Sequence, residues 1–434
     1  MRPAVLSLPL LAVGTAAQAE NLYTATATSA VYAAQATAKT LSNTSNVKGK
    51  AFDRFVVIWL ENTDYDMAYG DENLNWLAKK GITLSGYHAV THPSEPNYIS
   101  AIGGDYFGMQ NDNFNQIAQN VSTVIDLLED KGISWAEYQE DMPFSGFSGK
   151  QWVNQQNGKN DYVRKHNPAV IYNSAAGQID RLASMKNLSM FYTDLQNDAL
   201  PQWMFITPNM TSDAHDSDIQ TAGTWTRNFL EPLLEDKKFM KNTLVLVTFD
   251  ENETYSIQNR VMGILLGDAV PAEQVGTTDS NFYNHYSEIA TVEANWDLHT
   301  LGRFDVGANV FQLVADKTGD TVRSWSASKA GGVELSQRYF NYSYAGAFNT
   351  HGGNQRYPAP NLSNCGGKTH NRTILPSIKE LWSSSSAPVY YSPQAGDSGW
   401  TASSFGIRAG FLGGVDKRET VYDTMIYNTL MWDA

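Results

Sequence analysis

Two short apolar runs constrain the fold of this chain more than any other feature. Residues 54–60 read RFVVIWL and residues 243–249 read TLVLVTF, without the polar alternation of a strand that has one face in water. Continuous runs of this kind are typical of strands that are buried on both faces, as in a parallel sheet covered by helices. The two runs therefore predict two buried strands of a parallel α/β sheet.

Weaker patterns around these runs supply the rest of the predicted sheet and its helices. Further strands are expected at 135–138, 190–195, 203–207 and 261–266, and helices at 71–80, 96–103, 122–131 and 222–234. Strands that alternate with helices indicate a parallel sheet with helices on both faces.

Composition divides the chain into four stretches. Residues 1–19 combine a basic start, a short apolar run and an Ala-Gln-Ala cleavage pattern, which predicts a secretory signal peptide. Residues 20–50 are rich in Ala, Thr and Ser and are expected to form a mobile leader or a loosely packed arm. The periodic core covers 51–317. Residues 318–434 lose this periodicity and are expected to form a loop-rich extension packed on the core, with a separate small domain as the alternative.

The balance of charges limits the partners of the chain. It carries 31 Lys and Arg against 45 Asp and Glu, a formal net charge of −14. Nucleic acid and anionic membrane surfaces are polyanions, so neither is expected as a partner. An anionic small substrate would need a local positive centre, which a bound cation could supply. No stretch after the signal peptide is long and apolar enough to span a bilayer, so we expect a soluble, exported protein.

Two further features bear on export. Asn-x-Ser/Thr sequons occur along the chain, among them Asn187, Asn252 and Asn361, and they predict a glycoprotein. Cys365 is the only cysteine, so an internal disulfide is excluded. It is expected to be buried and inert, and pairing between two chains is the alternative.

Oxygen-bearing side chains follow both central strands directly. Glu61 and Asn62 come after the first strand, and Asp250 and Glu251 come after the second. Ligands of open parallel sheets bind outside the carboxyl ends of the strands. Three carboxylates that meet there would repel one another without a cation. Oxygen ligands suit Mg, Ca, Mn or a similar divalent ion, so the pattern predicts one divalent metal site. Acidic residues that only cap helices or turns are the alternative.

A serine stands at the predicted start of a helix. Ser94 belongs to THPSEPNY at 91–98, and Pro96 suits the first turn of a helix. Free backbone N–H groups and the helix dipole at this end favour an anion, so they could stabilise a serine alkoxide and an incoming phosphate. A plain serine N-cap fits the same pattern equally well.

Two histidines are candidates for the same site. His215 lies in a loop after the strand expected at 203–207, and His285 precedes a helix-like stretch. Either could contact a phosphate oxygen or protonate a leaving group. For each of them, a surface or capping histidine is the alternative.

Four short segments occur together in an order that resembles a known family. They are ENTDYD at 61–66, HPSEPNY at 92–98, SDAHD at 212–216 and FDEN at 249–252. The chain resembles the phosphoesterase family that holds fungal secreted acid phosphatases, certain bacterial acid phosphatases and the non-specific phospholipases C. The likeness is greatest to the fungal phosphate-repressible acid phosphatases and extends over about residues 52–310.

The resemblance implies an alkaline-phosphatase-like α/β/α sandwich with a mostly parallel central sheet and one catalytic metal centre. Ser94 matches the nucleophile of the family, which is threonine in the phospholipase branch. The positions that match metal ligands are Glu61, Asn62, Asp250 and Glu251, and some relatives carry Asp at the last of these.

The resemblance also assigns the phosphate site. His215 and His285 match histidines that line it, and Asp216 is expected beside them. The histidine that acts as general acid is left open between His215 and His285.

The function expected from the sequence is a secreted, metal-dependent acid phosphatase that hydrolyses small phosphate monoesters through a phosphoserine. The histidines would have to be protonated, which fits work below about pH 6.5. A phospholipase C-type phosphodiesterase that uses the same site is the main alternative. A glycosidase that uses two of the carboxylates and a non-enzymatic binding protein are two further possibilities. An oligomer is possible.

Overall fold

An eight-stranded sheet built around the two apolar runs forms the centre of the fold. Strands β1 (Arg54–Leu60) and β9 (Thr243–Phe249) pair in parallel, with Arg54 opposite Thr243 and Leu60 opposite Phe249. Every residue of β9 is buried, and so are the last six residues of β1. The prediction of two buried strands in a parallel sheet is confirmed, and the structure places them next to each other.

The computed structural model describes residues 27–322, 329–330, 333–334, 347–348, 357–363, 365–366 and 372–387. The predicted signal peptide and most of the predicted C-terminal extension lie outside the described residues.

The order of the strands in the sheet is β11-β2-β10-β9-β1-β8-β4-β7. Neighbours pair in parallel except around β10, which runs antiparallel to both β9 and β2. The sheet is therefore mostly parallel, as predicted. The strands beside the two central ones are β2 (Ile82–Leu84), β4 (Trp135–Gln139), β7 (Met185–Asn187), β8 (Trp203–Thr207), β10 (Gly263–Leu266) and β11 (Thr277–Asp279).

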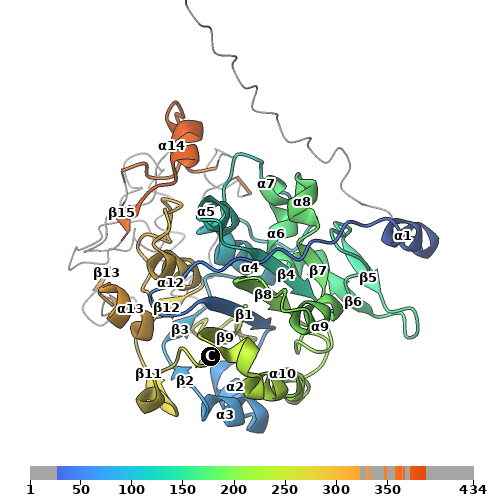
Figure 1. Cartoon of the computed structure of the whole chain (residues 1–434), viewed down its shortest axis with the longest axis horizontal. Helices are drawn as coiled ribbons and strands as arrows, with labels where there is room; N and C mark the ends of the chain where they lie inside the picture. Colours follow the sequence, from blue (N-terminus) through green and yellow to red (C-terminus); the bar gives the residue numbers. More distant parts are fainter. Residues whose placement is uncertain are drawn as a thin grey trace, which may run out of the picture.

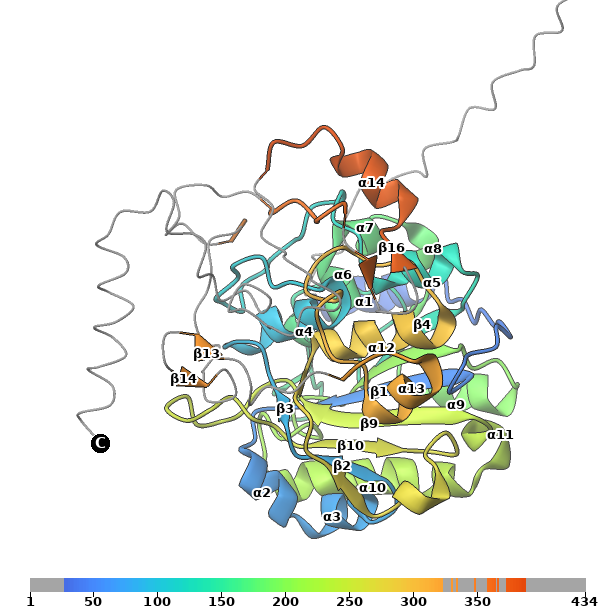
Figure 2. The ribbon, with the colours of Figure 1, turned by 90° about the vertical axis from the view of Figure 1, so that its left-hand side faces the viewer.

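Helices cover both faces of this sheet. Figures 1 and 2 place α3 (Glu72–Ala78) and α10 (Ile219–Glu235) on one side of the strands, and α4 (Ser94–Gly103) and α12 (Tyr286–Trp296) on the other. Every residue of α4 and α12 is buried, because these helices lie between the sheet and further segments of the chain. The predicted α/β/α sandwich is confirmed.

Shorter elements complete the described chain. The other helices are α1 (Thr28–Gln35), α2 (Tyr65–Gly70), α5 (Val124–Asp130), α6 (Pro168–Ile171), α7 (Asn173–Ala176), α8 (Ile179–Leu182), α9 (Ser189–Gln196), α11 (Lys237–Met240), α13 (Gln312–Thr318) and α14 (Pro376–Trp382). The two-stranded pairs are β3 (Tyr87–His88) with β12 (Tyr283–Asn284), β5 (Gln151–Val153) with β6 (Asn160–Val163), β13 (Lys329–Ala330) with β14 (Val333–Glu334), and β15 (Cys365–Gly366) with β16 (Arg372–Thr373). Within the described residues, no helix has both the length and the apolar character needed to cross a membrane.

One predicted strand is wrong. Residues 190–195 belong to helix α9, and the strand of this region is β7, which ends at Asn187. Phe191 and Asp194 are the buried residues of α9, three positions apart, which is a helical spacing. A short apolar run does not distinguish a strand from a helix when its length is below two helical turns.

The described parts of both terminal stretches contact the core. Ser45 Oγ donates to Gln202 Oε1 at 2.6 Å, just before β8, and the backbone N–H of Leu41 donates to the Ala183 carbonyl at 2.9 Å. From the other end of the chain, Trp382 Nε1 of α14 donates to the Asn120 carbonyl at 3.2 Å. The predicted boundaries at residues 20, 51 and 318 stay predictions.

Candidate active site

The residues that follow β1 and β9 meet at the carboxyl edge of the sheet. Because the two strands are adjacent and parallel, the Asp250 N–H donates to the Leu60 carbonyl at 3.0 Å. The Asn62 N–H in turn donates to Asp250 Oδ1 at 3.2 Å. Glu61, Asp250 and Glu251 are fully buried. The structure thus brings together the four residues predicted to bind a metal, and we call this group, with the side chains that contact it, the strand-end site.

Polar atoms crowd this site closely. One side-chain atom of the Asn62 amide lies 3.3 Å from Glu61 Oε2 and 3.2 Å from Glu251 Oε1. If the amide nitrogen takes this place, it donates to both carboxylates. If the oxygen takes it, three oxygens meet at one point, and such an arrangement needs a cation.

The carboxylates of the strand-end site are costly to ionise together. Burial raises the pKa of Glu61, and burial together with the charge of Glu61 raises the pKa of Asp250 and Glu251 well above the usual range. Asp250 Oδ2 is buried and accepts no hydrogen bond from the described residues. A divalent cation would satisfy this oxygen and offset the repulsion, so the residues present fit one.

Ser94 is the first residue of α4 and faces the carboxylates. Its Oγ donates to Glu61 Oε2 at 3.1 Å and lies 3.4 Å from Glu251 Oε1. The N-cap of α4 is Pro93, and the cap makes no side-chain hydrogen bond. The predicted position at the helix N-terminus is confirmed, and the alternative of a plain serine N-cap is wrong.

Lys165 brings a positive charge to the serine. Its Nζ lies 3.5 Å from Ser94 Oγ, 3.1 Å from Asp112 Oδ2 and 3.1 Å from His215 Nε2. Burial opposes the charge, but the carboxylates of Glu61 and Asp112 outweigh it, so the pKa of Lys165 is raised. Lys165 is not among the residues predicted from the sequence. The run Arg164-Lys165-His166 in an acidic chain was a weak signal for it.

His166 adds an imidazole to the other side of Glu61. Its Nε2 lies 3.1 Å from Glu61 Oε1, and its Nδ1 lies 3.4 Å from Asp213 Oδ2. Burial lowers the pKa of His166 well below its usual range, so the ring is neutral and able to bind a metal. Glu61, His166 and His215 each offer one ligand atom within 4.8 Å of the others. This second possible ligand group shares Glu61 with the predicted set.

The two predicted histidines lie in different surroundings. His215 is partly exposed, with Nε2 toward Lys165 and Nδ1 2.8 Å from Asp216 Oδ1. His285 is fully buried, with Nε2 2.7 Å from the Asp250 carbonyl oxygen and Nδ1 3.2 Å from the Tyr87 hydroxyl.

His285 is therefore not a group that faces Ser94. Both of its ring nitrogens contact protein atoms, and its ring packs against Trp59 with centroids 4.2 Å apart. Burial lowers the pKa of His285 to about 3, so the ring is neutral. In these contacts the ring supports the backbone of Asp250, and the expectation that His285 lines the phosphate site stays a prediction.

His92 is a second residue that sequence reasoning did not place. Its Nδ1 contacts Glu251 Oε2, and its ring stacks on Tyr255 with centroids 3.8 Å apart. Its position two residues before Ser94 was the available signal. The other unplaced histidine, His88, lies 3.1 Å from the Gly86 carbonyl and makes no described contact with the strand-end site.

Sequence comparisons give the family. The model of the Phosphoesterase family matches residues 71–299, more than half of the chain. A protein of Kluyveromyces lactis named probable acid phosphatase is 50% identical over 366 residues, which cover 84% of this chain and 82% of that protein. A phosphate-repressible acid phosphatase of Penicillium chrysogenum is 52% identical over 328 residues, covering 76% of this chain and 77% of that protein.

The comparisons also find a more distant relative and a solved structure. A phosphatidylinositol-3-phosphatase of Mycobacterium tuberculosis is 26% identical over 258 residues, covering 58% of this chain and 79% of that protein. The crystal structure of a Vibrio parahaemolyticus protein in the alkaline phosphatase superfamily matches with a TM-score of 0.39 and 8% sequence identity. The match covers 59% of this chain and 67% of the Vibrio chain. The resemblance seen in four short segments is confirmed by the family model and by the two fungal relatives: this chain belongs to the phosphoesterase family.

Proposed function

We propose that this chain is a secreted acid phosphatase that hydrolyses small phosphate monoesters through a phosphoserine at Ser94. The position of the Ser94 hydroxyl carries the proposal. It lies at a helix N-terminus, 3.1 Å from a buried carboxylate oxygen and 3.5 Å from a lysine ammonium. The relatives named acid phosphatase support the choice of a phosphate monoester as substrate.

The first step forms a bond between Ser94 Oγ and phosphorus. Glu61 Oε2 accepts the hydrogen bond of this hydroxyl and takes its proton as the oxygen attacks in line. Lys165 and the N-terminus of α4 hold negative charge on the phosphoryl oxygens.

The leaving oxygen needs a proton as its bond to phosphorus breaks. His215 is the candidate donor, because its Nε2 lies 3.1 Å from Lys165, which itself contacts Ser94, while Asp216 orients the ring through Nδ1. Water then attacks the phosphoserine and gives a proton to His215, while the bond between phosphorus and Ser94 Oγ breaks and Glu61 returns its proton to that oxygen. A histidine donor has to be protonated first, which fits an enzyme that works in acid.

The metal requirement is part of the proposal. Glu61, Asn62, Asp250 and Glu251 would hold one divalent cation, which supplies Lewis acidity and positive charge beside Ser94 when bound. His285 positions one of these ligands, since its Nε2 contacts the Asp250 carbonyl. His166 and Tyr98 both contact Glu61 Oε1, at 3.1 and 2.6 Å, and orient that carboxylate.

Replacement of Ser94 tests the proposal. Ser94→Ala and Ser94→Asp should each lose several powers of ten in turnover of p-nitrophenyl phosphate. Ser100→Ala is a matched control from the same helix, because the Ser100 hydroxyl donates to the Pro96 carbonyl at 2.7 Å. Rapid acid quenching with labelled substrate should place phosphate on the peptide that holds Ser94. An active Ser94→Asp enzyme, or a label on another peptide, would overturn the mechanism.

Export is tested separately. The mature chain should begin at or near Glu20, because Ala17-Gln18-Ala19 fits the cleavage pattern. N-terminal sequencing of protein from the culture medium should find this start, and Met1 in the secreted protein would contradict it.

A further inference from the structure

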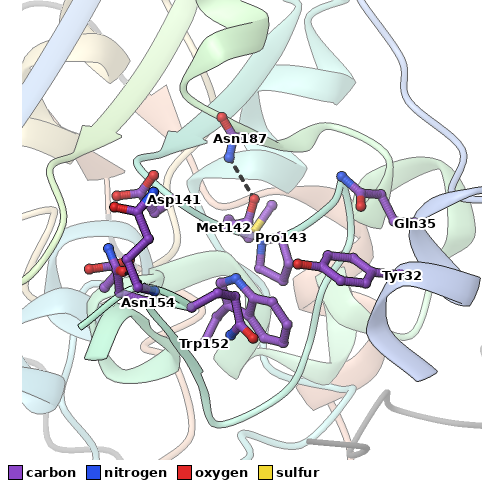
Figure 3. Close-up of a pocket in the computed structure, with 11 residues that line it drawn as sticks. Tyr32, Gln35, Asp141, Met142, Pro143, Trp152, Asn154 and Asn187 are labelled. Atoms are coloured by element: carbon purple, nitrogen blue, oxygen red, sulfur yellow. Dashed lines mark hydrogen bonds between the residues drawn. The ribbon is translucent and has the colours of Figure 1, made fainter. Parts of the chain in front are cut away.

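A cavity of about 360 Å³ opens beside helix α1, and none of its lining residues belongs to the strand-end site. Tyr32 comes from α1, Trp152 from β5, Asn154 from the turn after β5, and Asp161 from β6. Figure 3 shows Tyr32 reaching over the space from α1, with Asp141 and Asn154 opposite it. The volume is that of a small-ligand site, and we call this space the α1 cavity.

Two aromatic rings form one wall of the α1 cavity. Tyr32 and Trp152 meet edge to face with ring centroids 6.1 Å apart. Tyr32 is 52% exposed although it touches the cavity, and Trp152 is half-buried. Large aromatic side chains usually bury their surface, so an open pair offers apolar area to a ligand. A pyranose ring has such an apolar face in its C–H groups.

The polar groups of the cavity are neutral amides and carboxylates. Asn154, Gln156 and Asn187 supply amides, and Asp141 and Asp161 supply carboxylates. Among the described residues that line the cavity, none is Lys, Arg or His. Burial and the charge of Asp141 raise the pKa of Asp161. A phosphate ester would therefore be repelled, and the cavity is not a second site for the substrate of the strand-end site.

This set of groups matches hydroxyls better than it matches a cation. An amide offers a donor and an acceptor, and a sugar hydroxyl can pair with both. Asp141 Oδ2 already accepts from the Asn209 amide at 2.6 Å, so this carboxylate pairs with a neutral donor. A cationic ligand would pair with the carboxylate and amide oxygens but not with the amide N–H groups, whereas a hydroxyl can pair with either kind of group.

Asn187 links the cavity to carbohydrate in a second way. It lines the cavity and is the asparagine of an Asn-Leu-Ser sequon. Its Nδ2 donates to the Met142 carbonyl at 2.6 Å, the bond drawn in Figure 3. A glycosylated amide nitrogen keeps one hydrogen, so this bond can persist when a glycan is attached.

We propose that the α1 cavity binds one neutral saccharide unit, a hexose or N-acetylhexosamine, whose ring packs on Tyr32 and Trp152. The saccharide has two possible sources. It is either the glycan attached at Asn187 or a separate carbohydrate, and the recognition chemistry is the same for both.

The test uses the full chain in two forms. The first is made in a host without N-glycosylation, so that Asn187 is bare. Mannobiose, cellobiose and chitobiose are titrated while binding is followed by ligand-observed NMR, with tetramethylammonium as a cationic probe. We expect at least one disaccharide to bind, with its dissociation constant raised tenfold or more by Trp152→Ala and by Tyr32→Ala. Tyr32 is exposed on a terminal helix, so its variant should fold even if the Trp152 variant does not.

Trp76→Ala is the matched control, because Trp76 is also half-buried but lies on α3 against Arg227. It should bind the disaccharide as wild type does. All three variants should hydrolyse p-nitrophenyl phosphate at the wild-type rate, which separates this proposal from the proposed function.

The second form is made in a secreting, glycosylating host. If free disaccharide binds there only after Asn187→Gln, the attached glycan fills the cavity. If it binds to both, the ligand is a separate carbohydrate. The proposal is overturned if no disaccharide binds the bare chain, if binding survives both aromatic variants, or if only tetramethylammonium binds.

Discussion

The strand-end site and the α1 cavity both gather carboxylates, but they deal with the resulting charge in opposite ways. In the strand-end site, burial raises the pKa of Glu61, Asp250 and Glu251, and Lys165 stands beside them. In the α1 cavity, burial raises the pKa of Asp161, and no basic side chain is among the described lining residues.

The difference indicates what each region can bind. Carboxylates that crowd around a lysine and a serine hydroxyl can take up a cation and an anionic group together. Carboxylates among amides and aromatic rings suit a ligand without charge. The following changes test whether the two regions are as separate as their chemistry suggests, from the largest expected effect on activity to the smallest.

Asp250→Asn should have the largest effect. It removes one charge from the strand-end site at constant shape, so kcat/KM should fall by about 10³-fold or more. Elemental analysis of dialysed protein should show loss of a divalent metal while the circular dichroism spectrum is unchanged. Glu137→Gln is the control, since Glu137 is an equally buried carboxylate that accepts from the Ala169 N–H at 2.9 Å. Full metal occupancy in Asp250→Asn would show that Asp250 is not a ligand.

A comparison of two single variants can identify which residues bind the metal. His166→Ala should leave most of the metal in place if Glu61, Asn62, Asp250 and Glu251 hold it, and should strip the metal if Glu61, His166 and His215 hold it. Elemental analysis of His166→Ala beside Asp250→Asn distinguishes the two groups of ligands.

Lys165→Met should have the next largest effect on activity, with a loss of about 10²- to 10³-fold in kcat. The change removes the ammonium 3.5 Å from Ser94 Oγ and keeps much of the side-chain volume. Inhibition by inorganic phosphate should weaken together with turnover, because the same charge holds both. Lys159→Met, an exposed lysine between β5 and β6, serves as the control and should be neutral. Unchanged phosphate inhibition in Lys165→Met would remove Lys165 from the phosphate site.

The sequence predicted the parts of the molecule that follow from local pattern. The apolar runs located β1 and β9, and parallel pairing then required Glu61 and Asp250 to be neighbours. The segment around Pro96 placed Ser94 at a helix start. Each of these inferences uses residues that are adjacent in the chain or strands that are adjacent in the sheet.

The rest of the site depends on tertiary packing that no local pattern specifies. From one 3₁₀ turn much further along the chain, His166 contacts Glu61 and Lys165 contacts Ser94. His285 matched a family position, but its burial against Trp59 turns both ring nitrogens to protein partners. The α1 cavity joins a helix of the predicted leader to the β5–β6 hairpin, and neither segment has a motif.

His285→Ala should have a smaller effect than loss of the lysine, about 10- to 100-fold in kcat, because the ring acts through Asp250. His285→Gln should restore part of the activity by keeping a donor for the Asp250 carbonyl. The loss should be equal for p-nitrophenyl phosphate and for an alkyl phosphate. His215→Ala should instead lower the rate with the alkyl phosphate far more than the rate with p-nitrophenyl phosphate, because a poor leaving group needs the proton. A leaving-group dependence in His285→Ala would restore His285 as the acid.

Asp161→Asn in the α1 cavity should have the smallest effect, which is on stability and not on turnover. Burial raises the pKa of Asp161 when the chain is folded, so this carboxyl ionises more readily in the unfolded chain. The folded state therefore loses stability relative to the unfolded state as pH rises through the unfolded pKa near 3.9. Asn cannot ionise, so the variant should match wild type below that pH and exceed it at pH 7 by less than about 1 kcal/mol.

Urea unfolding at several values of pH between 3 and 7 measures this difference, and Asp218→Asn is a control of opposite sign. Hydrogen bonds from the Thr221 backbone and side chain lower the pKa of Asp218, so its contribution is present at neutral pH and is lost as pH falls. A chelator should leave the gain in Asp161→Asn unchanged if the α1 cavity takes an uncharged ligand, as proposed. The same chelator should lower the stability of every variant that keeps the strand-end site intact. If the chelator abolishes the gain, the two regions share a cation, and the contrast between them fails.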